Sequence, residues 1–202
     1  MDDLWVICPN GHYRAVIEGL LGRRIHLGIR EVTWRVTCVS VGGASYLLDH
    51  VAELAQLGRA KYSHCLVLVG ADHCVNGEDP AATEADLDAA MAECWDKDAK
   101  AIVIDPSLEA WLIHGHRAFA QVATLRGADV RGWSAEQGLW PLKDVAPDDP
   151  GALLRRIFTE AGAAASPASY RRIVKEMGLR HDRIENPSLR RCLRTLRTWF
   201  LA

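Results

Sequence analysis

The feature that most constrains the fold is a continuous apolar run, residues 65–69 (CLVLV), which carries no charged side chain. A strand with one face in water alternates apolar and polar residues, whereas a strand buried on both faces does not. The run therefore predicts a central strand of a parallel sheet that is covered by helices on both sides. A second run, residues 101–104 (AIVI), predicts another buried strand of the same kind.

Strands and helices alternate along the first half of the chain. Residues 4–8 (LWVIC) precede a Pro-Asn-Gly turn, and residues 31–41 alternate and are β-branched, so both segments predict strands. Apolar residues at helical spacing predict helices over residues 12–21, 46–57 and 80–95, and a further one from residue 108. This alternation indicates an α/β fold with a mainly parallel sheet flanked by helices.

The length of 202 residues suits one compact unit. We expect an α/β core over residues 1–125, an irregular connecting segment over 126–150, and a basic helical C-terminal extension over 151–202. Within the extension, helices are predicted over residues 152–161, 167–177 and 187–200. Ser166 and Asn186 are expected N-caps, because each is followed by a proline at the first helical position.

Composition and charge limit which binding partners and which cellular location are expected. The formal net charge is −2, so nucleic-acid binding would need a local basic patch rather than a generally basic protein. No segment resembles a signal peptide, and no apolar run approaches the roughly 18 residues that span a membrane. We therefore expect a cytoplasmic protein without a membrane segment, whose six cysteines are reduced thiols.

A basic patch is present near the C-terminus. Between residues 171 and 197 nine lysines and arginines face three acids, a local charge of +6 with histidine neutral. The candidates for binding a nucleic-acid backbone are Arg171, Arg172, Arg190, Arg191, Arg194 and Arg197. Arg190, Arg194 and Arg197 fall on one helical face. The alternative is that the arginines dock against the acidic half of the same chain or against an acidic partner.

Carboxylates follow two of the buried strands, where ligands of parallel sheets bind. Asp72 follows the strand at residues 65–69. Asp105 follows the strand at 101–104, and Glu109 shares its face if a helix begins there. Mg²⁺ and Mn²⁺ take oxygen ligands of this kind, and two-metal phosphodiester cleavage requires a cluster of them. The alternative for Asp72 and Asp105 is capping of a turn or helix.

Soft ligands also lie near the strand ends. Cys8 and His12 flank the first strand end, and His73 and Cys74 follow Asp72. A Zn²⁺ site would use such side chains, but their spacings match no standard zinc pattern, so Zn²⁺ is the less favoured metal.

The order of these elements resembles a TOPRIM domain of the kind found in overcoming-lysogenization-defect (OLD) nucleases and related small prokaryotic defence proteins. The matching stretches are residues 6–21 (VICPNGHYRAVIEGLL), 39–48 (VSVGGASYLL), 67–74 (VLVGADHC), 106–115 (PSLEAWLIHG) and 186–196 (NPSLRRCLRTL). Together they cover nearly the whole chain. The Leu-Glu-Ala-Trp-Leu sequence after a strand, combined with the late Pro-Ser segment, is the most specific part.

The resemblance implies which residues would act. Asp72 and Glu109 would be catalytic, and Asp72, Asp105 and Glu109 would hold Mg²⁺ or Mn²⁺. The sequence departs from the family at two acids. The glutamate after the first strand falls near Cys8 or Pro9, and the first aspartate of the Asp-x-Asp pair is Gly70.

Two functions follow as hypotheses. The first is a nuclease-derived component of anti-phage or anti-plasmid defence that hydrolyses phosphodiesters of DNA or RNA. The resemblance implies that it acts beside an ATPase subunit, in a hetero-complex or a homo-oligomer. The second is a catalytically inactive TOPRIM relative that serves as a structural or sensing subunit of a larger complex, which the two missing acids favour. A primase- or topoisomerase-like role is a third, weaker hypothesis.

Overall fold

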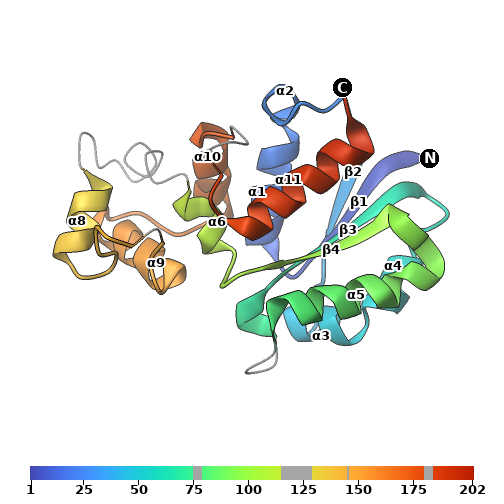
Figure 1. The fold of residues 1–202 in the computed structure, drawn as a ribbon, viewed down its shortest axis with the longest axis horizontal. Coiled ribbons are helices and arrows are strands. Elements are labelled where there is room, and N and C mark those ends of the chain that lie inside the picture. The colour runs from blue at the N-terminus through green and yellow to red at the C-terminus, as the bar shows by residue number, and fades with distance from the viewer. Residues whose placement is uncertain (75–78, 115–128, 145, 180–183) are drawn as a thin grey trace.

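A parallel sheet forms the centre of the molecule. The computed structural model describes residues 1–74, 79–114, 129–144, 146–179 and 184–202. Among these residues four strands form one sheet in the order β2-β1-β3-β4, and all of its pairings are parallel (Figure 1). The strands are β1 (Asp2–Cys8), β2 (Trp34–Cys38), β3 (Tyr62–Gly70) and β4 (Ala99–Ile104). The predicted α/β class with a parallel sheet is confirmed.

Helices cover both faces of the sheet (Figure 1). One face carries α1 (Gly11–Leu21), α10 (Pro167–Glu176) and α11 (Pro187–Phe200). The other face carries α3 (Gly43–Asp49), α4 (Val51–Gln56) and α5 (Pro80–Trp95). The remaining described helices are α2 (Arg24–Leu27), α6 (Glu109–Ile113), α8 (Val130–Glu136) and α9 (Pro150–Glu160). Helices α8 and α9 lie together beyond α6, away from the sheet.

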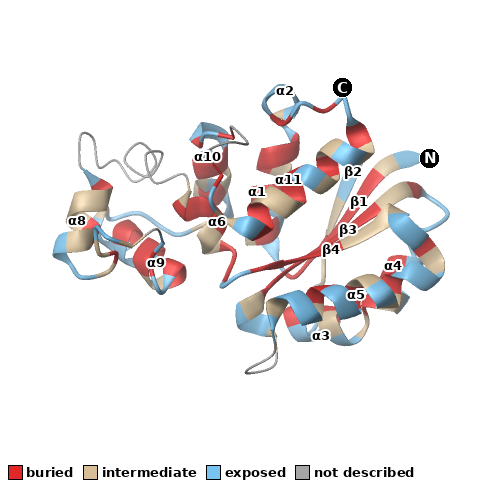
Figure 2. Cartoon of the chain, viewed as in Figure 1, coloured by how far each residue is buried: buried red, intermediate tan, exposed pale blue. Residues whose placement is uncertain are grey.

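The apolar run that predicted a central strand is buried on both faces. In β3, Leu66 and Leu68 enter the core beneath α1 and α11, whereas Cys65, Val67 and Val69 enter the core beneath α4 and α5. Successive side chains of a strand point to opposite faces, so a strand between two helical layers has no polar position. Figure 2 shows the strands as a largely buried band between helices whose outer sides are exposed.

The C-terminal helical extension is confirmed, and it packs back onto the core. Helix α11 buries Leu189, Leu193, Leu196 and Phe200 in the same core as the sheet. Asn186 caps it by accepting a hydrogen bond from the Leu189 N–H at 2.9 Å, as predicted, and such a cap contributes about 1 kcal/mol. Helices α10 and α11 of the extension therefore belong to one layer of the α/β fold, whereas α9 lies away from the sheet beside α8.

Helices α1 and α10 approach each other closely at a glycine. A Cβ atom at Gly19 of α1 would lie only 3.0 Å from Cγ1 of Val174 on α10. Ser166 caps α10 by accepting a hydrogen bond from the Ser169 N–H at 3.2 Å, as the sequence predicts. The close packing fixes α10, and with it Tyr170, against the carboxyl end of β1.

Three local predictions were wrong. The single helix expected over residues 46–57 is two helices, α3 and α4, separated at His50. Helix α3 begins earlier than expected, after Gly42, whose φ of 71° favours glycine. The second strand spans only residues 34–38, not 31–41.

The segment expected to be irregular, residues 126–150, contains helix α8. Asp129 caps this helix by accepting a hydrogen bond from the Arg131 N–H at 3.1 Å. Arg131 then stacks over the buried ring of Trp140 at 3.9 Å and donates a 2.8 Å hydrogen bond to the Pro141 carbonyl. The predicted boundary between residues 125 and 126 lies outside the described residues. No helix in the described part of the chain is long and apolar enough to cross a membrane.

Candidate functional site at the carboxyl ends of the strands

Asp72 lies at the end of the central strand. It belongs to the short 3-10 helix η1 (Ala71–His73), which directly follows β3. Its N–H donates a 2.9 Å hydrogen bond to the Pro106 carbonyl, so the turn after β3 is tied to the turn after β4. The side chain is 47% exposed, and its Oδ1 lies 3.9 Å from Nε2 of His73. Asp72 is thus held in place through its backbone, and its carboxylate is half-buried.

Glu109 is joined to the C-terminal part of the chain by a buried tyrosine. It is the first residue of α6, and its Oε1 accepts a 2.7 Å hydrogen bond from the hydroxyl of Tyr170 on α10. The ring of His12 on α1 lies 4.7 Å from the Tyr170 ring. Burial raises the pKa of Tyr170, and the negative charge of Glu109 raises it further. The hydroxyl therefore remains protonated and orients Glu109.

A second buried tyrosine couples the two carboxylates. Burial raises the pKa of Tyr13 on α1, and the charges of Asp72 and Glu109 add to the rise. Burial also raises the pKa of Asp72, where the charge of Glu109 acts in the same direction and His73 opposes it. The charge of Glu109 therefore acts on both Asp72 and Tyr13. The predicted pair of acids is brought together, flanked by two phenols.

The space beside Gly70 is filled. A Cβ atom at Gly70 would lie 2.6 Å from the Tyr13 hydroxyl and closer still to Oδ1 of Asp72. Real Cβ atoms essentially never approach other atoms so closely, so a larger side chain here requires the ends of the Asp72 and Tyr13 side chains to move. An aspartate at this position, as in the Asp-x-Asp pair, does not fit the present arrangement.

Thiols lie at the end of β1, close to where the resemblance to TOPRIM domains would place a glutamate. Cys8 is buried, and its Sγ lies 3.8 Å from Sγ of Cys38 on β2 and 3.7 Å from the Asn10 carbonyl oxygen. Burial raises the pKa of Cys8, and the neighbouring Cys38 raises it further. The thiol is therefore protonated at neutral pH and is a poor replacement for an anionic oxygen ligand.

The third predicted ligand, Asp105, has no hydrogen bond or ion pair with Asp72 or Glu109 among the described residues. Asp105 is exposed, and its carbonyl oxygen accepts a long hydrogen bond of 3.5 Å from Asn186. Across the described ranges, no group of three or more His, Cys, Asp or Glu side chains is arranged to hold a metal ion. The residues present do not fit a two-metal centre. A ligand role for Asp72 and Glu109 stays a prediction.

Two of the three arginines predicted to share a helical face contact the chain itself. The guanidinium of Arg190 donates to the Ile184 carbonyl through Nε at 3.1 Å. Nε of Arg197 donates to the Leu27 carbonyl at 2.6 Å. Arg194, between them, is exposed and has no hydrogen-bond or ion-pair partner among the residues that the structure describes.

Two further candidate arginines pair with acids of the same chain. Arg171 on α10 forms an ion pair with Glu18 on α1. Arg191 on α11 reaches past β4 to Glu84 on α5, with Nη2 2.8 Å from Oε2, and it also donates to the Val103 carbonyl at 3.3 Å. These contacts favour the alternative in which the arginines dock against the acidic half of the chain.

Like Arg194, Arg172 stays a candidate for binding a nucleic-acid backbone, because it is exposed and has no hydrogen-bond or ion-pair partner among the described residues. The sequence pattern did not reveal Tyr13 and Tyr170. Tyr170 contacts Glu109 across 61 positions, which no local spacing signals. Tyr13 lies a few residues after the end of the first strand. A hydroxyl near a strand end was the one feature of the sequence that could have marked it as part of the site.

Comparison with known proteins gives no match to a family model, to a curated protein or to a solved structure. The resemblance to TOPRIM proteins therefore rests on the sequence stretches quoted above.

Proposed function

We propose that this chain is a nuclease-derived, TOPRIM-like subunit of a cytoplasmic prokaryotic defence assembly, that it acts beside an ATPase, and that it does not cleave phosphodiesters by a two-metal mechanism. The filled space beside Gly70 is the observation that supports the last part, the absence of two-metal cleavage. The Tyr13 hydroxyl and the Asp72 carboxylate occupy the volume that a further acidic ligand would need.

The remaining groups at the strand ends support the same reading. Two-metal cleavage uses ions that are clamped by several carboxylates. Here Glu109 already accepts a hydrogen bond from Tyr170, and Cys8 is a buried, protonated thiol. A site with two acids and two phenols is better suited to binding, in which the carboxylates meet a cationic or hydrogen-bonding group of a partner.

A second candidate is a one-ion site, which the mutual repulsion of the acids favours. The charge of Glu109 raises the pKa of Asp72, so a cation between the two carboxylates would relieve unfavourable energy. Mg²⁺ commonly binds through one or two carboxylates and keeps several waters, and a substrate phosphate completes its shell. Arg172 and Arg194 are then the residues available to hold a nucleic-acid backbone.

Cleavage assays separate the two candidates. End-labelled single- and double-stranded DNA and RNA are incubated with Mg²⁺ or Mn²⁺ and the chain, alone and with its co-purified ATPase. The inactive-subunit proposal predicts that wild type and Asp72→Asn give the same background. Asp105→Asn is the matched control, because Asp105 is exposed and outside the coupled pair. Cleavage that disappears in Asp72→Asn and Glu109→Gln but persists in Asp105→Asn would overturn the proposal and establish the one-ion site.

Nucleic-acid binding is tested on the two exposed arginines. If the one-ion candidate is right, the double change Arg172→Glu with Arg194→Glu weakens binding and flattens its salt dependence. Arg190→Ala is the matched control on the same helix face, since its guanidinium contacts the Ile184 carbonyl.

A further inference from the structure

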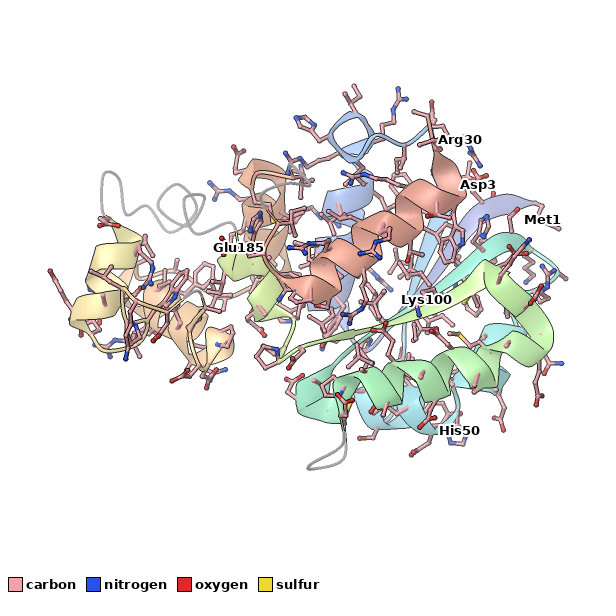
Figure 3. All side chains as sticks on the ribbon, in the orientation of Figure 1. Met1, Asp3, Arg30, His50, Lys100 and Glu185 are labelled. Carbon is pink, nitrogen blue, oxygen red and sulfur yellow. The ribbon has the colours of Figure 1, made fainter. Side chains whose placement is uncertain are left out.

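The outward backbone groups of the two edge strands, β4 and β2, differ in whether they have hydrogen-bond partners. The outer N–H groups of the edge strand β4 are occupied by carboxylates from α5. The Ala101 N–H donates to Asp88 Oδ1 at 2.7 Å, and the Val103 N–H donates to Glu84 Oε2 at 2.9 Å. Arg191 adds a hydrogen bond to the Val103 carbonyl. Lys100, labelled in Figure 3, pairs with Asp88 beside them. This edge is closed to further strand pairing.

The opposite edge, β2, is open. The Leu4 N–H donates to the Thr33 carbonyl and the Val39 N–H to the Cys8 carbonyl, both across the β1–β2 boundary. Backbone groups of a strand alternate in direction, so the odd-numbered residues here face β1. Trp34, Val36 and Cys38 therefore turn their N–H and C=O groups outward. No described residue forms a hydrogen bond with any of these six groups.

Among the described residues, the open edge lacks most of the usual protections against pairing, although β2 is short and carries one charged side chain, Arg35. Natural edge strands are blunted by proline, by lysine, by bulges or by a covering element. The sequence of β2 (WRVTC) holds no proline and no lysine, and its register with β1 runs unbroken through all five residues. Trp34 leaves 40% of its surface exposed. An unbroken edge with unpaired outward backbone groups is a template for a further strand.

We propose that β2 pairs with β2 of a second copy of this chain, antiparallel, about a two-fold axis through Val36. In that register Val36 lies opposite its own copy and Trp34 lies opposite Cys38 of the other chain. All three are residues with outward groups, so each directly opposed pair exchanges two hydrogen bonds. Every outward N–H and C=O of Trp34, Val36 and Cys38 is satisfied, and the two sheets join into one.

The side chains and charges favour a second copy as the occupant. Trp34, Val36 and Cys38 lie on the α1 side of the sheet, so apolar groups meet apolar groups across the axis. On the other side, Arg35 lies opposite Thr37 of the second chain. The one charged residue of the strand therefore faces a hydroxyl and no like charge. Such a self-complementary patch is what an isologous dimer requires.

The inference is independent of the proposed function, and sedimentation equilibrium tests it. Wild type is expected at twice the 22.3 kDa of one chain. Val36→Pro removes an outward N–H that β1 does not use, and proline is tolerated at such a place on an edge strand. This variant is expected to be folded by circular dichroism and monomeric. Val36→Ala is the matched control, because it trims the side chain, keeps the N–H and is expected to stay dimeric.

A cross-linking experiment reads out the register and does not depend on the proline variant folding. Arg35→Cys and Thr37→Cys chains are mixed and oxidised, and linked peptides are identified by mass spectrometry. The proposed register places positions 35 and 37 of the two chains directly opposite, at a separation that a disulfide spans. Links between 35 and 37, without links between two copies of 35, are expected. A monomeric wild type, a dimer that persists in folded Val36→Pro, or links in another register would overturn the inference.

Discussion

Replacing Glu84 with alanine should lower the free energy of unfolding by about 3 kcal/mol. Glu84 is only 7% exposed, and its Oε2 accepts hydrogen bonds from the Val103 N–H at 2.9 Å and from Arg191 at 2.8 Å. Leaving a buried N–H without a partner costs about 1–3 kcal/mol, and losing a charged hydrogen bond costs about 1.5–3 kcal/mol. Together these costs span about 2.5–6 kcal/mol, and the 36% exposed side chain of Arg191 regains part of its loss from water, which places the total near the lower end, at about 3 kcal/mol.

Urea unfolding followed by circular dichroism measures this cost, and a double-mutant cycle with Arg191→Ala isolates the pair. We expect the double variant to be less destabilised than the sum of the two single variants, because both break the same contact. Arg194→Ala is the control, since Arg194 is exposed on the same helix, and its effect should stay within about 0.5 kcal/mol. A loss below about 1 kcal/mol for Glu84→Ala, together with a neutral Arg191→Ala, would refute the reasoning and return Arg191 to the nucleic-acid candidates.

Three further predictions concern packing and pH. Gly58→Ala should destabilise the chain by about 3 kcal/mol, measured by urea unfolding, because the new Cβ would lie within 2.5 Å of the buried Trp5 ring; an unchanged midpoint would contradict this packing. The fold raises the pKa of Asp72, chiefly through burial, so the ionised carboxylate opposes folding once the pH rises above the ordinary value of 3.8. Asp72→Asn should therefore stabilise the chain at neutral pH, and the gain should vanish below pH 3.8; a loss of stability at neutral pH would contradict it. Asp3 has its pKa lowered to about 2, first by the hydrogen bond from Arg30, which lies beside it near the end of α11 in Figure 3. Its contribution is present above pH 3.8 and is lost as the pH falls through about 2, so Asp3→Asn should destabilise the chain at neutral pH, with an effect that shrinks on acidification and disappears well below pH 2; the test is thermal unfolding across this range.

Much of the fold could be predicted because its signals are local. The apolar run of β3 and the bounds of α5 follow from residues that lie next to one another. The break at His50 had no such signal, since neither glycine nor proline marks it, and the Tyr46 and His50 rings meet there at 4.2 Å. Helix α8 was missed because its cap, Asp129, and the glycine that follows resemble a loop.

The candidate site was predicted in part. Asp72 and Glu109 follow strand ends, and parallel strands bring such ends together, so their proximity is a consequence of topology. The arginines could not be placed in this way. The contact of Arg191 with Glu84 spans 107 positions, and that of Arg171 with Glu18 spans 153. Such pairs depend on how helices pack across the sheet, which a charge count along the sequence does not reveal.

The number of divalent ions that the strand-end site holds tests most directly whether this chain lacks a two-metal centre. Calorimetric titration of Mn²⁺ into wild type and Asp72→Asn, each with and without a bound oligonucleotide, measures the stoichiometry per chain. The account predicts fewer than two ions per chain, with any single weak ion lost in Asp72→Asn. Two ions per chain that both require Asp72 and Glu109 would contradict it, because the Tyr13 hydroxyl beside Gly70 would then not exclude a two-metal centre.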